Sequence, residues 1–152
     1  MVNIHKNFLT ESECTALLKV AIDKFEIDRR TYSGWSCRVN RSLEFENRIK
    51  NILTNISPYE SFHISWINLT EYKQGSSLEL HKDERSNFTF TIPLTSKYQG
   101  GDFLIEGSIY KLNLGDCIAF TGGELEHGVT EVRDGYRASL NIWIKQGNKK
   151  VI

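Results

Sequence analysis

The pattern of hydrophobic and polar positions divides the chain into a helical first third and a β-rich remainder. An apolar stripe with helical spacing follows Thr10, and Glu13 stands three positions after Thr10, as in a capping box. We therefore expect the first helix to begin directly after Thr10. A second amphipathic helix is predicted over residues 42–55, whereas residues 28–41 are polar and are predicted to form a loop or an irregular strand. The stripe of the first helix consists of Cys14, Leu17, Leu18 and Ile22.

Short runs rich in β-branched and aromatic residues dominate the chain from residue 61 onward, with glycine or asparagine at the turns. This spacing is typical of a jelly-roll sandwich, so the expected fold class is α+β with the helices packed on one sheet. In the last run, apolar residues from Ala138 to Ile144 alternate with polar ones, which predicts one face under the helices and one face lining an interior site. The predicted strands are 61–72, 78–83, 88–94, 101–106, 108–112, 117–120, 127–132 and 136–145.

The last two runs are predicted to form a β-hairpin with a three-residue loop that ends at Gly135, which takes the left-handed conformation. In this register His127 pairs with Asn141. Because side chains alternate with a period of two, His127 would then share a face with Arg137 and Ser139. A two-residue turn would separate His127 from Arg137.

Composition limits the class of protein. A chain of 152 residues fits one domain, expected to span residues 1–152 and to bury a single core. Basic and acidic residues number 19 each, and a formal net charge of +0 gives no global attraction to nucleic acid, so a nucleic-acid partner is not expected. No apolar run is long enough to span a bilayer, which predicts a soluble protein without a membrane partner. Three cysteines without paired spacing, and an N-terminus without a secretory segment, favour the cytoplasm.

Two histidines and an aspartate have the pattern of a metal site. His81 and Asp83 stand two positions apart in a predicted strand, so both side chains point to one side while Lys82 faces away. His127, in a later strand, would complete a 2-His-1-carboxylate site. Such a site binds Fe(II) on one face and leaves the opposite positions open, which suits oxygen activation. A His-x-Asp pair alone also arises by chance, so the prediction depends on His127 and on the residues around it.

Arg137 has the chemistry to bind a carboxylate beside this metal site. The planar guanidinium can hold a carboxylate through two parallel hydrogen bonds, and the Ser139 hydroxyl can add a third. A dicarboxylate could then bind the metal at one end and Arg137 at the other. The competing interpretation is that Arg137 forms only an exposed ion pair with Glu131, its partner in the predicted hairpin.

Together with their neighbours, these residues resemble the Fe(II)/2-oxoglutarate-dependent dioxygenases, and within them the prolyl 4-hydroxylase-like group. The resemblance covers nearly the whole chain. It implies a double-stranded β-helix (jelly roll) with the N-terminal helices packed on one sheet. It also implies Fe(II), 2-oxoglutarate and O2 as cofactor and co-substrates, with ascorbate as a candidate stimulant. The segments that carry the resemblance are 7–14, 81–83, 100–102, 115–120 and 127–140.

The resemblance implies a role for each matching residue. The two histidines and Asp83 match the iron ligands, and Arg137 matches the basic residue that binds the far carboxylate of 2-oxoglutarate. Tyr72 matches a tyrosine that lines the co-substrate pocket, and Trp143 matches a tryptophan near the site, where relatives that repair alkylated nucleic acid bases usually hold a second arginine. Aromatic side chains in a sandwich also pack in cores, so both interpretations of Tyr72 and Trp143 stay open. Residues 92–94 depart from the family, because some relatives carry a tyrosine there that hydrogen-bonds the co-substrate.

The expected activity is hydroxylation of a substrate C–H bond, coupled to oxidative decarboxylation of 2-oxoglutarate to succinate and CO2. A prolyl residue of a peptide or protein is the first substrate that the resemblance suggests. Two alternatives stay open: a free amino acid or other small metabolite as substrate, or a metal- or 2-oxoglutarate-binding jelly-roll module without turnover. The complete set of His81, Asp83, His127 and Arg137 argues against the module, because a protein that only binds needs no open coordination positions.

Overall fold

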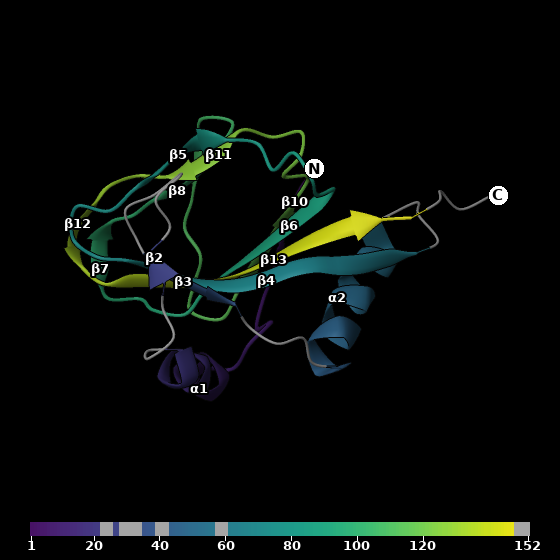
Figure 1. Cartoon of the computed structure of the whole chain (residues 1–152), viewed down its shortest axis with the longest axis horizontal. Coiled ribbons are helices and arrows are strands. Elements are labelled where there is room, and N and C mark those ends of the chain that lie inside the picture. Colours follow the sequence, from purple (N-terminus) through teal and green to yellow (C-terminus); the bar gives the residue numbers. More distant parts are fainter. Residues whose placement is uncertain (22–25, 28–34, 39–42, 57–60, 148–152) are drawn as a thin grey trace.

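The β-rich part of the chain folds into two antiparallel sheets that face each other (Figure 1). The computed structural model of the protein describes residues 1–21, 26–27, 35–38, 43–56 and 61–147. Within these ranges the strands form a seven-stranded sheet, a four-stranded sheet and a two-stranded ribbon. In spatial order, the large sheet consists of β1 (Val2–His5), β10 (Cys117–Phe120), β6 (Phe88–Pro93), β13 (Arg137–Gln146), β4 (Phe62–Tyr72), β3 (Trp35–Arg38) and β2 (Glu26–Ile27); the small sheet of β5 (Leu78–His81), β11 (His127–Val129), β8 (Phe103–Ile105) and β9 (Ser108–Tyr110); and the ribbon of β12 (Val132–Gly135) and β7 (Tyr98–Gly100).

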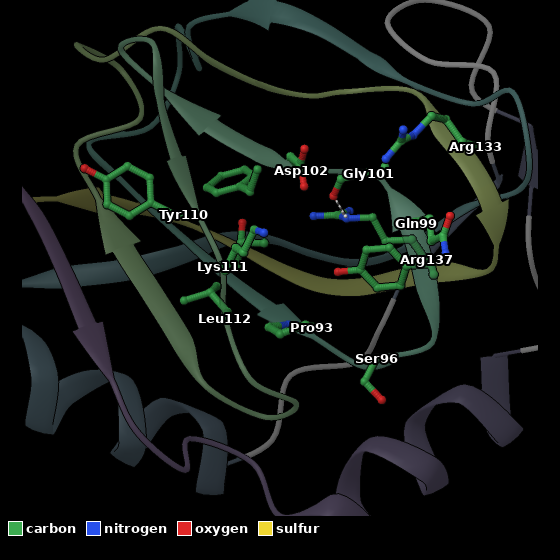
Figure 2. A pocket seen from close by; sticks show the side chains of 14 residues that line it. Pro93, Ser96, Gln99, Gly101, Asp102, Tyr110, Lys111, Leu112, Arg133 and Arg137 are labelled. Atoms are coloured by element: carbon green, nitrogen blue, oxygen red, sulfur yellow. Dashed lines mark hydrogen bonds between the residues drawn. The ribbon is translucent and has the colours of Figure 1, made fainter.

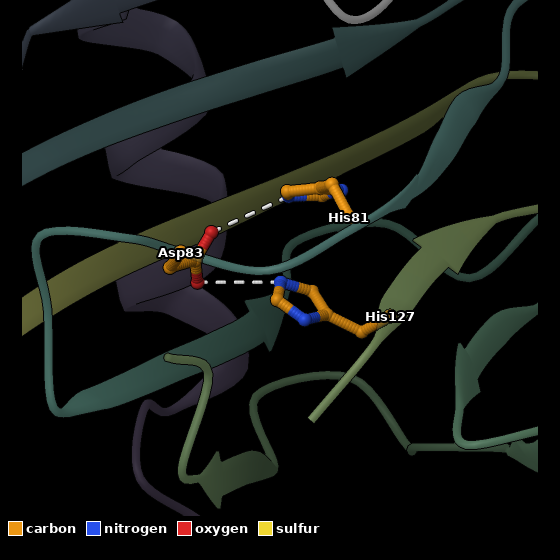
Figure 3. Close-up of side chains that lie close together, drawn as sticks. All are labelled: His81, Asp83 and His127. Atoms are coloured by element: carbon orange, nitrogen blue, oxygen red, sulfur yellow. Dashed lines mark ion pairs between the residues drawn. The ribbon is translucent and has the colours of Figure 1, made fainter. Parts of the chain in front are cut away.

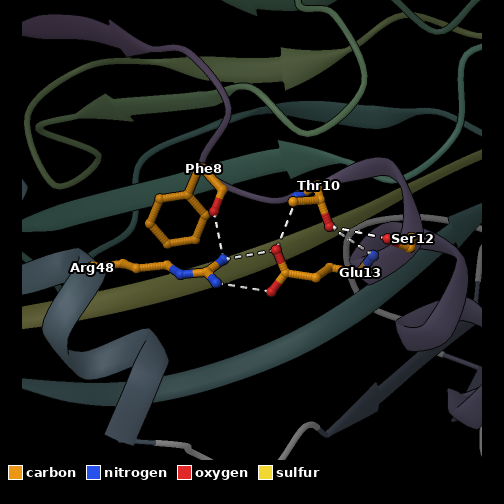
Figure 4. Close-up of polar contacts among 5 residues, drawn as sticks. All are labelled: Phe8, Thr10, Ser12, Glu13 and Arg48. Carbon is orange, nitrogen blue, oxygen red and sulfur yellow. Dashed lines mark hydrogen bonds and ion pairs between the residues drawn. The ribbon is translucent and has the colours of Figure 1, made fainter.

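Two helices lie on the outer side of the large sheet (Figure 1). Helix α1 (Glu11–Ala21) begins directly after Thr10, as predicted, and α2 (Leu43–Ile56) is shifted by one residue from its predicted range. The capping box is formed in both directions: the Thr10 amide donates to Glu13 Oε1 at 2.9 Å, and the Glu13 amide donates to Thr10 Oγ1 at 3.1 Å. Arg48 of α2 donates to both carboxylate oxygens of Glu13, at 3.2 and 2.9 Å (Figure 4). The cap of α1 therefore also links the two helices.

The large sheet separates two groups of buried side chains. Its outer face packs against Phe8, Leu9 and Leu53, which come from the N-terminal segment and from α2. Its inner face, which includes Tyr72, packs against the small sheet. The prediction that the last strand turns an apolar face toward the helices is confirmed. That face consists of Ala138, Leu140, Ile142 and Ile144, which are completely buried.

The predicted hairpin between the last two runs is wrong. Strand β11 pairs with β5 and β8, β12 pairs with β7, and β13 pairs with β4 and β6. Gly135 has the expected left-handed conformation, with a φ of 83°, but it carries the chain from the ribbon into the large sheet. Because other strands occupy both edges of β13, His127 does not pair with Asn141. For the same reason Glu131 does not pair with Arg137. His127 and Arg137 belong to opposite sheets and both face the interior between them.

The remaining strand predictions agree with the structure to within three residues at each end. Strands β1, β2 and β7 have no counterpart in the prediction, and β12 covers the residues that were predicted to be the hairpin loop. Within the segment predicted to be irregular, residues 35–38 form β3 beside β4, whereas 28–34 and 39–41 lie outside the described residues, as does Ile22. In the part of the chain that the structure describes, no helix is long and apolar enough to cross a membrane.

Candidate metal centre and adjoining cavity

Three potential metal ligands meet where the small sheet faces the large one. His81, the last residue of β5, pairs directly with His127, the first residue of β11, and their ring centroids lie 4.4 Å apart. Asp83 follows two residues after His81, in a loop that its own amide fixes by donating to the Gly122 carbonyl at 2.8 Å. One candidate ligand atom from each of the three residues lies within 4.8 Å of the others (Figure 3). Strand β5 ends at His81, so Asp83 lies in the loop that follows and not in the strand as predicted. The conformation of this loop brings Asp83 into the site.

Backbone carbonyls orient both imidazole rings. His81 Nδ1 lies 2.8 Å from the Glu79 carbonyl oxygen, and His127 Nδ1 lies 2.8 Å from the Leu125 carbonyl oxygen. A carbonyl only accepts hydrogen bonds, so each Nδ1 carries a hydrogen, and each Nε2 is left to bind either a proton, which it donates, or a metal ion. Both Nε2 atoms face the Asp83 carboxylate, at 3.3 Å for His81 and 3.2 Å for His127.

Without a cation the three residues form a charge-coupled cluster. Burial alone would raise the pKa of Asp83, but hydrogen bonds from His127, His81 and Thr89 outweigh burial and hold that pKa well below its usual range. The hydrogen bond with Asp83 raises the pKa of His81. The carboxylate is therefore ionised and attracts positive charge into the site.

The chemistry of this donor set fits a divalent transition metal. Two imidazole nitrogens and a carboxylate converge, and a metal ion would take the place of the hydrogens that link them in the metal-free site. A cation at this point would balance the charge of Asp83 and bind both Nε2 atoms. Two histidines and one carboxylate are the ligands of the Fe(II) site that keeps several coordination positions open.

Aromatic rings close the site around one of the histidines. The ring of Phe120 lies edge-on to His127, with centroids 4.7 Å apart, and Phe103 lies 6.4 Å away. The side chain of His127 is 4% exposed, whereas that of His81 is 28% exposed. Access from solvent is therefore on the side of His81.

Arg137 places a charged group in the same interior, from the opposite sheet. The residue is 5% exposed, and its Nε donates to the Gly101 carbonyl at 3.1 Å. Its Cζ lies 4.9 Å from the centre of the Tyr72 ring, a cation–π contact between directly paired residues of β13 and β4. Arg137 forms no salt bridge with a carboxylate of any described residue. The competing interpretation of Arg137, an exposed ion pair with Glu131, is therefore wrong.

A cavity of about 380 Å3 adjoins the guanidinium of Arg137. Figure 2 shows the side chain of Arg137 reaching toward Gly101 beside Asp102. The cavity extends to Thr91 and Phe103, and Phe103 is one of the rings beside His127. None of the three candidate ligands lines this cavity, which approaches them through Phe103, a ring shared by the cavity wall and the surroundings of His127. Residue 101 favours glycine, because its φ is 60° and a Cβ there would lie 2.9 Å from Arg137 Cδ.

Ser139 belongs to a polar network on the inner face of β13. Its hydroxyl lies 3.3 Å from Asn141 Oδ1, which also accepts from Thr91 Oγ1 at 3.3 Å. The Asn141 amide donates to Asn68 Oδ1 at 3.1 Å and to Thr70 Oγ1 at 2.9 Å. Ser139 is thus two residues from Arg137 on the correct face, but it is not among the residues that line the cavity. Its contact with a carboxylate stays a prediction.

The two predicted aromatic site residues take different positions. Tyr72 is buried and supports Arg137, and it does not line the cavity. Trp143 is half-buried and pairs with Thr89 of β6, which contacts Asp83. Sequence reasoning missed Thr89 and Thr91, although their alternation with apolar residues in β6 is the signal that places both on the inner face.

Comparison with solved structures shows the same fold in several oxygenases. A viral collagen prolyl hydroxylase from Paramecium bursaria Chlorella virus-1, in its 2OG complex, superposes with a TM-score of 0.82 at 17% identity, over 96% of each chain. A prolyl-4-hydroxylase from Pseudomonas putida gives a TM-score of 0.72 at 16% identity, covering 97% of this chain and 93% of that one. HygX from Streptomyces hygroscopicus, with nickel and 2-oxoglutarate bound, gives 0.77 at 9% identity, covering 95% and 82%. No curated protein matches the sequence.

A family model described as the 2OG-Fe(II) oxygenase superfamily matches residues 67–145. This range is more than half of the chain, and it contains the candidate ligands His81, Asp83 and His127 together with Arg137. The fold, the converging ligand atoms and the cavity at Arg137 agree with that match. The chain belongs to the 2OG-Fe(II) oxygenase superfamily.

Proposed function

We propose that the protein hydroxylates a C–H bond of its substrate, using Fe(II) held by His81, Asp83 and His127 and 2-oxoglutarate anchored by Arg137. When bound, the metal and co-substrate supply oxygen activation: one oxygen atom of O2 enters the substrate, and the other enters succinate as 2-oxoglutarate loses CO2. The residues of the protein bind, orient and shield the reacting groups.

The buried guanidinium of Arg137 is the observation that carries this proposal. An unpaired charge in a protein interior is costly, and the described residues give Arg137 a carbonyl and an aromatic ring but no carboxylate. The cavity at its side is also lined by Phe103, whose ring lies 6.4 Å from that of His127. A dicarboxylate bound there would supply the missing negative charge at one end and reach the metal with the other.

The surrounding residues prepare the site for this chemistry. The carbonyls of Glu79 and Leu125 keep both histidines with Nε2 toward the metal. Phe103 and Phe120 exclude water on the His127 side. The half-exposed side of His81 leaves a path for the substrate.

A prolyl residue in a peptide or protein is the substrate that we propose first. Structural neighbours with this fold include two prolyl hydroxylases and one that is in complex with a peptide fragment of a hypoxia inducible factor. Trp143 lies beside Thr89 on the inner face, where an aromatic ring can pack against a pyrrolidine. The second candidate is a small molecule, which is supported by the neighbour HygX in its complex with hygromycin B.

Succinate formation tests the proposal and separates these substrates. The purified protein, with Fe(II), ascorbate and 2-oxoglutarate, is assayed with proline-containing peptides and, in parallel, with free proline. We expect succinate and a peptide heavier by one oxygen atom. Hydroxylation of free proline alone would favour the small-molecule substrate. If neither substrate is oxidised and 2-oxoglutarate is not consumed, the prolyl substrate is wrong and the binding-module alternative is favoured.

A further inference from the structure

The two oxygens of the Asp83 carboxylate have different surroundings. Oδ1 lies 3.3 Å from Nε2 of His81, the more exposed histidine. Oδ2 lies 3.2 Å from Nε2 of His127 and also accepts a hydrogen bond from the Thr89 hydroxyl at 2.5 Å. Thr89 is 3% exposed and comes from β6 of the large sheet, across the interior from both histidines. Among the described residues of the large sheet, Thr89 therefore donates a hydrogen bond to Oδ2 of Asp83 and none donates to Oδ1.

Gly122 packs closely against Oδ2 of Asp83. A Cβ at this position would overlap with Thr89 Oγ1 and would lie 2.6 Å from Asp83 Oδ2. The Gly122 carbonyl also accepts from the Asp83 amide at 2.8 Å. Gly122 and Thr89 both pack against the Oδ2 side of the carboxylate, so Oδ2 is enclosed. Oδ1 faces His81, on the open side of the site.

This asymmetry matters because a carboxylate can bind a metal through one oxygen or through both. An iron centre of this kind works only if its other positions stay open for co-substrate and oxygen. A second oxygen from Asp83 would occupy one of those positions. Because a hydrogen bond from Thr89 uses a lone pair of Oδ2, it favours binding of the metal through Oδ1.

We propose that Thr89 is a positioning residue that reserves Oδ2 of Asp83 through its hydroxyl hydrogen bond, so that Asp83 offers the metal Oδ1 alone and a coordination position stays open for 2-oxoglutarate. The inference rests on the proposed function, because it requires a metal at the three ligands. It assigns a role to the polar face of β6, which the ligand pattern in the sequence does not include.

The test replaces the hydroxyl by a methyl group of similar volume. Thr89→Val removes the hydrogen bond, Thr89→Ser keeps it, and Thr54→Val makes the same exchange on the exposed part of α2, far from the site. Each protein is titrated first with Co(II), whose visible absorption responds to the number of ligands, and then with 2-oxoglutarate. Thermal unfolding of the metal-free proteins shows whether each variant is folded.

We expect Thr89→Val to bind Co(II) with an altered visible spectrum and to bind 2-oxoglutarate more weakly, because the second oxygen of Asp83 would compete for a coordination position. Loss of a hydrogen bond to a metal ligand typically changes metal affinity or activity by roughly 10–100-fold, and we expect a loss of 2-oxoglutarate affinity of similar size. Thr89→Ser and Thr54→Val should match the wild type in both titrations. A wild-type spectrum and unchanged 2-oxoglutarate affinity in Thr89→Val would overturn the inference. So would a folded Thr89→Val protein that no longer binds Co(II), because the hydroxyl would then retain the ligand rather than limit its oxygens. If the wild type itself binds no 2-oxoglutarate after Co(II), the proposed function fails as well.

Discussion

At the scale of single residues, Arg137 carries the largest share of the expected co-substrate affinity. Charged hydrogen bonds contribute about 1.5–3 kcal/mol, which corresponds to roughly 10–100-fold in affinity. Arg137→Ala should therefore raise the 2-oxoglutarate concentration that half-saturates succinate formation by about that factor. The affinity for the metal should stay the same, because Arg137 does not contact the ligands.

Arg137→Lys is the matched control for this prediction. Lysine keeps the charge but lacks the planar fork that holds a carboxylate through two hydrogen bonds. Arg137→Lys should therefore bind 2-oxoglutarate more weakly than the wild type but more tightly than Arg137→Ala. The measurement is the 2-oxoglutarate concentration that half-saturates succinate formation, with both variants shown to be folded. If Arg137→Ala keeps the wild-type value, the guanidinium has another purpose.

The candidate ligands and Arg137 could be predicted from the sequence, because a His-x-Asp pair, a distant histidine and a following arginine seldom occur together by chance. Thr89 could not be predicted in the same way. A threonine in a strand is common, and its contact with Asp83 joins β6 to a loop of the small sheet. Such a contact depends on how the two sheets face each other.

At the scale of the elements, the capping box of α1 is a local feature with a measurable effect on stability. Loss of an N-cap side chain typically costs about 1 kcal/mol, so Thr10→Ala should lower the free energy of unfolding by that amount in urea. Thr15→Ala is the control, because Thr15 is exposed on the same helix and donates only to the Glu11 carbonyl. Equal effects of the two substitutions would show that the cap contributes nothing.

Strand partners were harder to predict than strands. Gly135 signals a left-handed residue, which fits a hairpin loop as well as the crossing between two sheets that the structure shows. Period-two alternation places Arg137 on the correct face of β13, but it carries no information on which strands lie beside β13. The predicted proximity of His127 and Arg137 across a hairpin was thus wrong in its cause, although both residues face the same interior.

At the scale of the whole molecule, a buried carboxylate connects the N-terminal strand to the sandwich. Asp116 accepts from the Asn7 amide at 3.1 Å and from Lys6 Nζ at 3.0 Å. Burial alone would raise the pKa of Asp116, but these two partners lower it. A lowered folded-state pKa stabilises the protein above the unfolded-state pKa of about 4, and that stabilisation is lost as the pH falls through the folded-state value.

Asp116→Asn should therefore unfold more easily than the wild type near neutral pH, by about 1–2 kcal/mol, mainly because the amide of Asn7 loses a charged partner. Lys6 is 67% exposed and contributes little. The difference between the two proteins should shrink below about pH 4. Urea unfolding at neutral and acidic pH measures it, and a gap that widens in acid would contradict the sign of the shift.

The α+β sandwich as a whole was predictable because short β-rich runs separated by turn residues recur from residue 61 onward, and β6 and β13 alternate clearly between apolar and polar residues. The outer and inner faces of β13 follow from this pattern alone. Strands β1 and β7 were not predictable, because each is short and owes its pairing to a neighbour distant in the sequence. Local pattern thus specifies layers, and tertiary contacts specify the order of strands within them.

At the centre of this fold we expect one site that holds a metal and 2-oxoglutarate together. The most direct measurement is titration of 2-oxoglutarate into the Fe(II)-loaded protein without oxygen, following the visible charge-transfer band of the chelate, with Asp83→Ala as the control. We predict a saturable band in the wild type, no band in Asp83→Ala, and no turnover by that variant. A folded, iron-loaded wild type that gives no band, or a band that persists in Asp83→Ala, would contradict the account.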